Sequence, residues 1–273
     1  MNGKKLEAKE YYISYFDILG YKAFFEDKEN NISELLASNI AMAMDTRKRF
    51  SYLLPITNKI HYKMFSDNFI IMLEDGVLPA DKALSVMCDL TARLQLKFLV
   101  DYGIPIRGAI TKGQAYIDNT IVFGKGLIDA VGLEASEAIY PRIILDDACS
   151  EMIRKGLNIK SVGLDKDQKY YLDFLSLLMT KDDSDPGVSV KMNREKIGER
   201  ICKLVSRYGH YDKRITKIEK INQNEKTILK YLWLLIKYNE FADKYHLVPR
   251  IDYSFVANES LFRFEIVDVR LEQ

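Results

Sequence analysis

Residues 11–20, with the sequence YYISYFDILG, are the stretch that decides the predicted fold. Aromatic and β-branched side chains predict a strand that runs to Asp17, and Gly20 marks the turn that ends it. An acidic residue that directly follows an apolar strand and precedes a short loop can hold a hard cation through its carboxylate and through backbone carbonyls. The stretch therefore predicts a strand with a candidate metal ligand at its end.

The elements that follow this strand are predicted from the period of the apolar residues and from turn chemistry. In chain order, the predicted elements are strand 11–17, helix 32–44, strands 60–65 and 69–73, a helix between Pro79 and Gly103, strand 104–111 with an extended piece through Tyr116, helix 124–138 and strand 141–145. The order β-α-β-β-α-β is the split βαβ pattern. We therefore predict an α+β protein with a ferredoxin-like sheet.

A second acidic residue lies in the turn between the two short strands. Residues 66–68, SDN, are typical of a turn, so the strands form a hairpin with Asp67 at its tip. In a split βαβ sheet the first strand and the hairpin can lie side by side, so Asp17 and Asp67 can converge. Two carboxylates that bridge divalent ions would polarise a triphosphate and lower the pKa of an attacking hydroxyl. Each aspartate alone is more typical of a turn former, and only the combination favours a metal site.

Composition excludes several classes of protein. The chain has 273 residues, of which 48% are hydrophobic, and this size allows one large domain or a catalytic domain with an appendage. A formal net charge of +1 excludes a surface that is basic throughout and binds nucleic acid. The three cysteines have no CxxC spacing, which argues against a disulfide framework and a zinc site. We expect a cytoplasmic protein, since no apolar run has the length of a membrane span and the first residues lack a signal-peptide core.

The neutral total hides two regions of opposite charge. Residues 191–250 contain 15 basic and 7 acidic residues, while the rest of the chain has more acidic than basic ones. The change follows the polar segment 181–187, which contains a Pro-Gly turn signal. We therefore predict a catalytic domain at residues 1–185 and a basic, mainly helical C-terminal extension at 186–273 that ends in a strand-like segment.

Several short motifs carry a family resemblance. Residues 16–20 (FDILG), 63–67 (KMFSD), 106–113 (IRGAITKG) and 123–124 (FG) leading to Leu133-Glu134 resemble, in this order, the landmarks of class III nucleotidyl cyclases. Within that superfamily the chain is most similar to the pyrimidine nucleotide cyclases of the bacterial Pycsar anti-phage systems. Residues 140–143 (YPRI) and 230–239 (KYLWLLIKYN) extend this similarity, which covers about the first 150 residues and touches the C-terminal region.

The resemblance implies an activity and a set of site residues. The reaction would convert UTP or CTP to the 3′,5′-cyclic monophosphate and pyrophosphate, and a separate effector would read this product in antiviral defence. The chain would be a homodimer with active sites at the subunit interface. The implied site residues are Asp17 and Asp67 with the backbone of Ile18 for two Mn²⁺ or Mg²⁺ ions, the backbone of Phe16, Leu19 and Gly20 near the phosphates, and Lys63 and Arg107 for the nucleotide.

The chain departs from the better-known cyclases at three positions. Lys63 matches the lysine with which adenylate cyclases read the purine, but Ile121 replaces the acid that accompanies it, and this favours a smaller pyrimidine base. The Asn and Arg that stabilise the transition state in those cyclases fall on Ile128 and Gly132. Arg142 is the first candidate to supply the missing positive charge to the developing oxyanions, ahead of Arg107 and Lys125. The other interpretation of Arg142 is an ion pair at the rim.

Two alternative functions remain open at this point. The lost Asn and Arg are compatible with a degenerate cyclase that binds and senses nucleotides without turnover. The basic segment 191–250 is compatible with nucleic-acid binding, although solvated Lys and Arg faces on helices explain it more simply. We therefore expect a nucleoside triphosphate as the ligand, and neither a membrane nor a nucleic acid as a partner.

Overall fold

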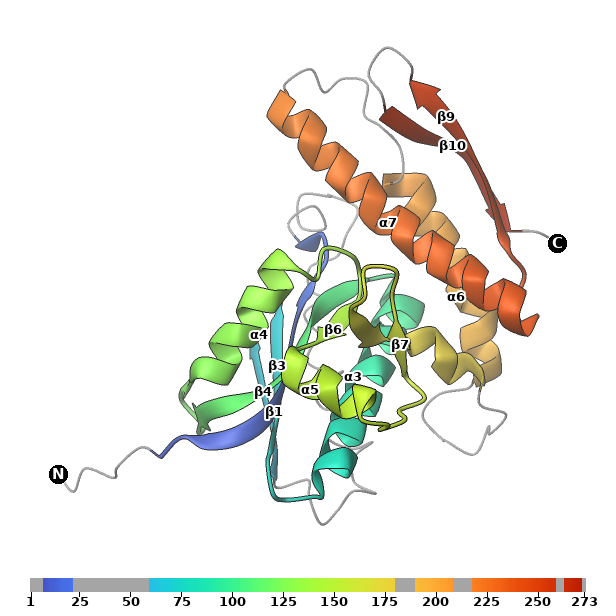
Figure 1. Cartoon of the computed structure of the whole chain (residues 1–273). Helices are drawn as coiled ribbons and strands as arrows, with labels where there is room; N and C mark the ends of the chain where they lie inside the picture. The colour runs from blue at the N-terminus through green and yellow to red at the C-terminus, as the bar shows by residue number, and fades with distance from the viewer. Residues whose placement is uncertain (1–6, 22–58, 180–189, 209–217, 259–262, 272–273) are drawn as a thin grey trace. The chain divides into compact units, whose positions relative to one another are not determined.

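The computed structural model of the chain describes residues 7–21, 59–179, 190–208, 218–258 and 263–271 (Figure 1). They belong to two compact units. The first is formed from residues 1–94, 106–138 and 142–173, and the second from residues 95–105, 139–141 and 174–273. The predicted helix 32–44 and the predicted boundary between residues 185 and 186 lie outside the described residues, so both stay predictions.

The first unit is built around β1 (Lys9–Ile18), which contains most of the stretch that decides the fold. It pairs antiparallel with β3 (Asn68–Glu74) on one side and with β4 (Ile106–Ile117) on the other. β2 (Ile60–Phe65) forms the predicted hairpin with β3. The prediction of these strands from their apolar, β-branched pattern is confirmed.

The sheet order confirms the split βαβ pattern. The strands lie in the order β2-β3-β1-β4-β6-β8-β7, with β5 paired to β4. The remaining strands and helices of this sheet region are α3 (Ala80–Tyr102), β5 (Val122–Phe123), α4 (Lys125–Ser136), β6 (Ile143–Leu145), α5 (Asp147–Arg154), β7 (Val162–Leu164) and β8 (Tyr170–Leu172). The β3-α3-β4 crossover straddles β1, which separates the two strands it connects. The protein is therefore α+β, with a ferredoxin-like arrangement of its first strands.

The two faces of β1 are covered by different helices, because side chains alternate along a strand. On one face, the buried Thr91 hydroxyl of α3 donates to Ser14 Oγ at 3.1 Å. On the other face, Ile13 belongs to a buried apolar cluster. Tyr15 of β1 and Leu127 of α4 pack against this cluster. Asp17 follows Tyr15 by two positions and therefore lies on the α4 face.

One predicted strand is longer than expected. The prediction had strand 104–111 and a separate extended piece, whereas β4 runs unbroken over Ile106–Ile117. Its residues 106–115 pair continuously with β1, so the sheet holds the polar positions around Lys112 in register. Tertiary pairing here outweighs the local turn signal of Gly113.

The second unit contains the helix-rich C-terminal extension that was predicted. Its elements are η3 (Phe174–Met179), α6 (Val190–Tyr208), α7 (Ile218–Tyr245) and the antiparallel pair β9 (Ile251–Asn258) and β10 (Arg263–Leu271). The Asn239 side chain donates to the Ile251 carbonyl at 2.8 Å and accepts from the Ile251 amide at 2.9 Å. This double hydrogen bond joins the end of α7 to the start of β9. Among the described helices, none is long and apolar enough to cross a membrane.

Candidate active site

The two predicted aspartates lie at neighbouring strand ends. Asp17 is opposite Asn68 in the β1–β3 ladder, and Asp67 directly precedes Asn68. The Ile18 amide donates to the Asp67 carbonyl at 3.2 Å, which ties the hairpin tip to the end of β1. Ser66 supports this tight tip with a left-handed φ of 58°. The sheet therefore brings Asp17 and Asp67 together across 50 positions of sequence.

Arg107 joins these residues from β4. Its guanidinium donates from Nε to Asp17 Oδ1 at 3.1 Å and from Nη2 to Asp17 Oδ2 at 3.2 Å. The same Nη2 lies 2.6 Å from Glu134 Oε1 on α4. Asp17 is opposite Arg107 in the antiparallel ladder, so this contact follows from strand register. One guanidinium is thus shared by two carboxylates.

Burial and charge set the protonation of this cluster. Burial raises the pKa of Asp17 above its usual range, although the hydrogen bonds and charge of Arg107 oppose the shift. The pKa of Tyr15 is raised to about 12 by burial and by the negative charges of Glu134, Asp17 and Asp67. The Tyr15 hydroxyl therefore stays protonated at neutral pH and donates to Asn68 Oδ1 at 2.5 Å.

The other predicted residues of segment 16–20 are buried side chains at the end of β1 or belong to the turn that follows it. Phe16 is fully buried and stacks on Phe69 with ring centroids 5.1 Å apart, so its side chain belongs to the core. Leu19 is also buried. Gly20 has φ 79°, which lets the chain turn away from the end of β1. From Phe16, Leu19 and Gly20, only backbone groups are candidates for phosphate contacts, as the resemblance implies.

Lys63 lies on the edge strand β2, on the same face as Tyr15. The ladder pairs Lys63 with Ile70 and Ile70 with Tyr15, so the three residues share the α4 face. Its ammonium donates to the Asn119 carbonyl at 2.5 Å. Asp118 holds this loop by accepting from the amides of residues 120 and 121. The hairpin is thereby linked to the β4–β5 turn, which carries Ile121.

The Arg142 side chain contacts a different pair of acids. Its guanidinium, which is 1% exposed, forms ion pairs with Asp165 and Asp167. Both acids belong to the turn between β7 and β8, so Arg142 ties this turn to the start of β6. Lys125, the third cationic candidate, pairs with Asp129 at 2.7 Å at the beginning of α4. Arg107 thus contacts Asp17, whereas Arg142 and Lys125 pair with other acids. The catalytic role predicted for Arg142 stays a prediction, and these contacts favour Arg107 for it.

Glu134 was missed as a site residue, although it stood in a motif that carried the resemblance. Gly126, Ala130 and Glu134 are the buried residues of α4 and follow one another at four-residue spacing. This spacing puts them on one helix face toward the sheet. An acid on a small, apolar stripe is a sequence signal for a buried charge that needs a partner.

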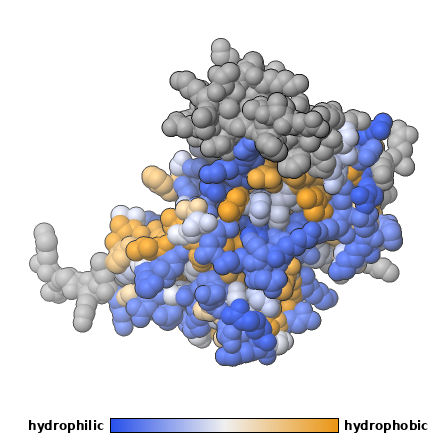
Figure 2. All heavy atoms as spheres, turned by 45° about the horizontal axis from the view of Figure 1, so that its top comes forward, coloured by the Kyte–Doolittle hydropathy of each residue, from blue (hydrophilic) through white to orange (hydrophobic). Residues whose placement is uncertain are grey.

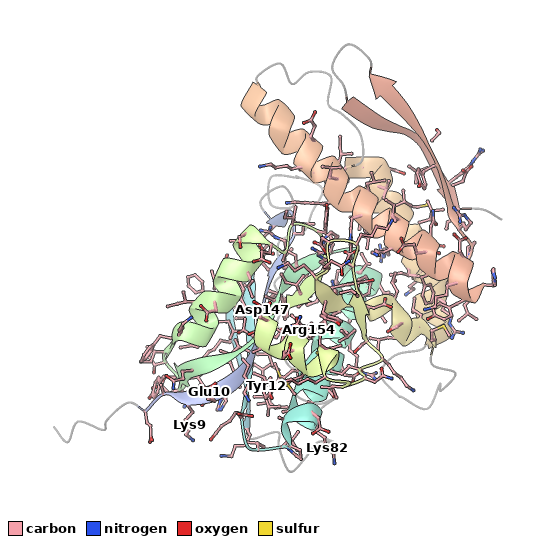
Figure 3. The ribbon with its side chains drawn as sticks, in the orientation of Figure 1. Lys9, Glu10, Tyr12, Lys82, Asp147 and Arg154 are labelled. Atoms are coloured by element: carbon pink, nitrogen blue, oxygen red, sulfur yellow. The ribbon has the colours of Figure 1, made fainter. Side chains whose placement is uncertain are left out.

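A separate groove lies between α4, α5 and the turn at residues 167–170. It has a volume of about 810 Å³ and is lined by Asp147 and Arg154 of α5, which Figure 3 labels. Asp17, Asp67 and Arg107 are not among its lining residues. Its lining contains five acidic and three basic side chains.

The oxygens at the site fit a hard divalent cation. Mg²⁺ is usually bound by one or two carboxylates together with substrate phosphates, and Mn²⁺ prefers the same oxygen ligands. Asp17 and Asp67, with the nearby Ile18 carbonyl, are a donor set of this kind. Within the described part of the chain, no group of three His, Cys, Asp or Glu side chains is arranged to hold a metal ion.

Comparisons with known proteins give distant similarities. No family model and no curated protein matches the chain. The adenylyl cyclase CyaB from P. aeruginosa is 17% identical, with a TM-score of 0.46 over 66% of this chain and 98% of that one. An adenylate/guanylate cyclase/hydrolase from Silicibacter pomeroyi is 16% identical, with a TM-score of 0.41 over 60% and 95%. A bacterial light-regulated adenylyl cyclase is 14% identical, with a TM-score of 0.40 over 62% and 92%. With TM-scores below 0.5, these similarities carry no argument about this chain.

Proposed function

We propose that the chain is a metal-dependent pyrimidine nucleotide cyclase that converts UTP, or CTP, to the 3′,5′-cyclic monophosphate and pyrophosphate. The observation that carries the proposal is the convergence of Asp17, Asp67 and Arg107 at the ends of three neighbouring strands. Cyclisation needs an activated 3′-hydroxyl and stabilised charge on the phosphates. Two carboxylates and one guanidinium are the groups that this chemistry requires.

The two aspartates and the Ile18 carbonyl would hold Mn²⁺ or Mg²⁺, two ions in each site. When bound, the ions would polarise the α-phosphate and lower the pKa of the attacking hydroxyl. Arg107 would bind phosphate oxygens, because its planar guanidinium makes paired hydrogen bonds to such anions. The role first given to Arg142, stabilising the developing negative charge, passes in this proposal to Arg107.

The choice of a pyrimidine base rests on Lys63 and Ile121. The purine-reading acid is replaced by Ile121, whose side chain can accept no hydrogen bond. The Lys63 ammonium is engaged by the Asn119 carbonyl. A pocket without the purine-reading pair suits a smaller base, and we propose UTP ahead of CTP as the substrate.

A second copy of the chain would complete the site, as the family resemblance implies. Large apolar side chains are exposed near the aspartates and on the outer side of α4: Phe65 at the hairpin tip is 79% exposed and Ile128 is 70% exposed. Figure 2 shows hydrophobic residues gathered at the left of the molecule, on the side where α4 lies in Figure 1. Exposed apolar residues of this size are typical of an interface. We propose a homodimer that buries them.

The biological role follows the resemblance to the Pycsar systems. The cyclic nucleotide would be a second messenger in bacterial antiviral defence, produced in the cytoplasm and read by a separate effector. This part of the proposal rests on the motifs at residues 16–20, 63–67, 106–113 and 140–143.

The test is product formation by the purified full chain. Each of the four NTPs is incubated with Mn²⁺, and cyclic product and pyrophosphate are measured. We expect cyclic UMP or cyclic CMP from wild type and from Asp129→Asn, a control that removes an exposed acid of α4, and none from Asp17→Asn. Equal activity of wild type and Asp17→Asn, or a product from ATP alone, contradicts the proposal. Tight NTP binding without pyrophosphate release favours the nucleotide-sensing alternative instead.

A further inference from the structure

One guanidinium serves two carboxylates beside the proposed metal site. Arg107 makes a two-pronged contact with Asp17 and a third contact with Glu134, at 3.1, 3.2 and 2.6 Å. The side chains of Asp17, Arg107 and Glu134 are only 17%, 21% and 8% exposed. Two acidic side chains therefore share one cationic side chain.

The contact with Asp17 has a direct consequence for a metal ion. Both oxygens of Asp17 accept hydrogen bonds from Arg107, and a metal ion needs at least one of them. Arg107 and the metal therefore compete for the same carboxylate. A guanidinium displaced from Asp17 keeps its charge at any accessible pH and requires another anion nearby.

Glu134 is that anion. We propose that Arg107 is a two-position counterion: it pairs with Asp17 before metal binds, and Glu134 holds it beside the site when metal takes Asp17. Glu134 is then a positioning residue, which keeps the guanidinium close to the phosphates without touching them. The inference rests on the proposed function, because it takes Asp17 to be a metal ligand.

The helix that carries Glu134 is firmly seated. Thr111 on β4 donates to the Gly126 carbonyl at 2.9 Å, and a Cβ on Gly113 would lie only 2.9 Å from Gly126 Cα. This close approach fixes α4 against the strand that carries Arg107. Two turns after Gly126, Glu134 is presented to the same strand from a rigid element, as a positioning residue requires.

A structural role alone predicts something different. If Glu134 only neutralises a buried arginine, its loss lowers the stability of the fold but leaves the metal affinity of Asp17 unchanged. If Glu134 pairs with Arg107 when metal is bound, the loss of Glu134 leaves Arg107 paired with Asp17. Metal then binds Asp17 more weakly. The two roles are therefore separated by metal affinity measured without any turnover.

The test is Mn²⁺ binding to the full chain in the absence of nucleotide, followed by calorimetry or by the electron paramagnetic resonance signal of free Mn²⁺. We expect Glu134→Gln to bind Mn²⁺ about tenfold more weakly than wild type, because the ion pair that holds Arg107 away from Asp17 is lost. Arg107→Gln should bind it about tenfold more tightly, since Asp17 loses its competitor. The double variant should match Arg107→Gln, because Glu134 acts through Arg107.

Three further variants make each outcome decisive. Asp129→Asn removes an acid from the exposed side of α4 and should leave Mn²⁺ affinity within twofold of wild type. Arg107→Lys keeps the charge without the paired contact, so it should bind Mn²⁺ more tightly than wild type even if Glu134→Gln does not fold. Asp17→Asn should lose high-affinity Mn²⁺ binding.

The outcomes separate the inference from the proposed function. If Asp17→Asn retains wild-type Mn²⁺ affinity, the proposed metal site fails. If Asp17→Asn loses binding while Glu134→Gln is unchanged, only the counterion inference is overturned. It is also overturned if Glu134→Gln weakens Mn²⁺ binding equally with and without Arg107, because the effect is then through-space charge, or if Arg107→Lys binds Mn²⁺ no more tightly than wild type.

Discussion

Two arginines of the first unit have the same kind of partners and opposite surroundings. Arg107 is the second residue of β4 and Arg142 directly precedes the neighbouring strand β6, and the Gly108 amide donates to the Arg142 carbonyl at 3.1 Å. Each guanidinium is shared by two carboxylates. Arg107 is 21% exposed, whereas Arg142 is sealed at 1%.

The difference lies in the elements that supply the acids. Asp17 and Glu134 come from a strand end and a helix that meet at the partly open site. The acids of Arg142, Asp165 and Asp167, come from the β7–β8 turn that closes over it. The guanidinium of Arg107 is therefore available to a ligand, whereas that of Arg142 stabilises the fold. The difference is the solvent exposure of the two side chains.

The largest expected effect separates the clusters by activity. Asp17→Asn should lower cyclase activity about a thousandfold, because metal ligation contributes several kcal/mol to transition-state stabilisation. Its effect on stability should be small, since burial already raises the pKa of Asp17 and disfavours its charged form. The matched variant Asp165→Asn should lower stability and keep the activity of its folded fraction. Turnover and thermal melting of both variants check this, and equal loss of activity in the two would erase the distinction.

The second effect separates the clusters by stability. Arg142→Gln leaves the buried Asp165 without its main counterion and should cost about 3–5 kcal/mol of unfolding free energy. Arg107→Gln should cost less, because water reaches part of its cluster, while it should nearly abolish turnover. Urea unfolding monitored by circular dichroism measures both. A larger stability loss for Arg107→Gln than for Arg142→Gln would reverse the assignment of the two arginines.

A third effect acts on Gly108, which directly follows Arg107 and donates its amide to the Arg142 carbonyl. A Cβ on Gly108 would lie 2.1 Å from the Tyr15 carbonyl oxygen and 2.6 Å from Phe16 Cα, so β1 and β4 cannot both keep their positions. Gly108→Ala should therefore cost about 3 kcal/mol and disturb both clusters. Gly132→Ala, on the open side of α4, meets nothing within 4 Å and should stabilise the protein by about 0.5–1 kcal/mol. Chemical denaturation compares them, and a neutral Gly108→Ala would contradict the close strand approach.

Sequence reasoning found the strands and the two aspartates because their signals are local. Residues 11–17 are rich in aromatic and β-branched side chains, and residues 66–68 have the chemistry of a turn. Asp17 lies at the end of a strand and Asp67 in the turn of a hairpin, so a correct sheet order was enough to bring them together. That order was itself predicted from the succession of elements.

The partners of the arginines were beyond sequence reasoning for a physical reason. Strand register sets Asp17 opposite Arg107, and register depends on pairings between distant segments. Arg142 meets Asp165 and Asp167 only because β8 pairs with β6 and brings the β7–β8 turn with it. The spacing of residues along the chain does not predict that the β7–β8 turn lies next to Arg142. Arg142 was therefore assigned to the site from its motif alone.

The smallest effect lies within the buried arginine cluster and depends on pH. The hydrogen bond and charge of Arg142 hold the pKa of Asp167 below its usual range. A lowered pKa stabilises the folded state above the unfolded pKa of about 4, and this contribution is lost as pH falls through the folded value. Because Asp167 is 45% exposed, solvent screening limits the contribution to under about 1 kcal/mol.

Asp167→Asn should therefore be slightly less stable than wild type at pH 7, and the gap should close as pH falls below about 4. Urea unfolding at pH 7, 5 and 3.5 measures the gap, with Asp129→Asn as an exposed-acid control. A gap that widens toward acid pH would mean that Arg142 does not stabilise the Asp167 carboxylate. The expected result would indicate that solvent exposure sets the strength of each ion pair even within one cluster. The half-exposed Asp167 would then contribute less than the buried Asp165 to holding the Arg142 guanidinium.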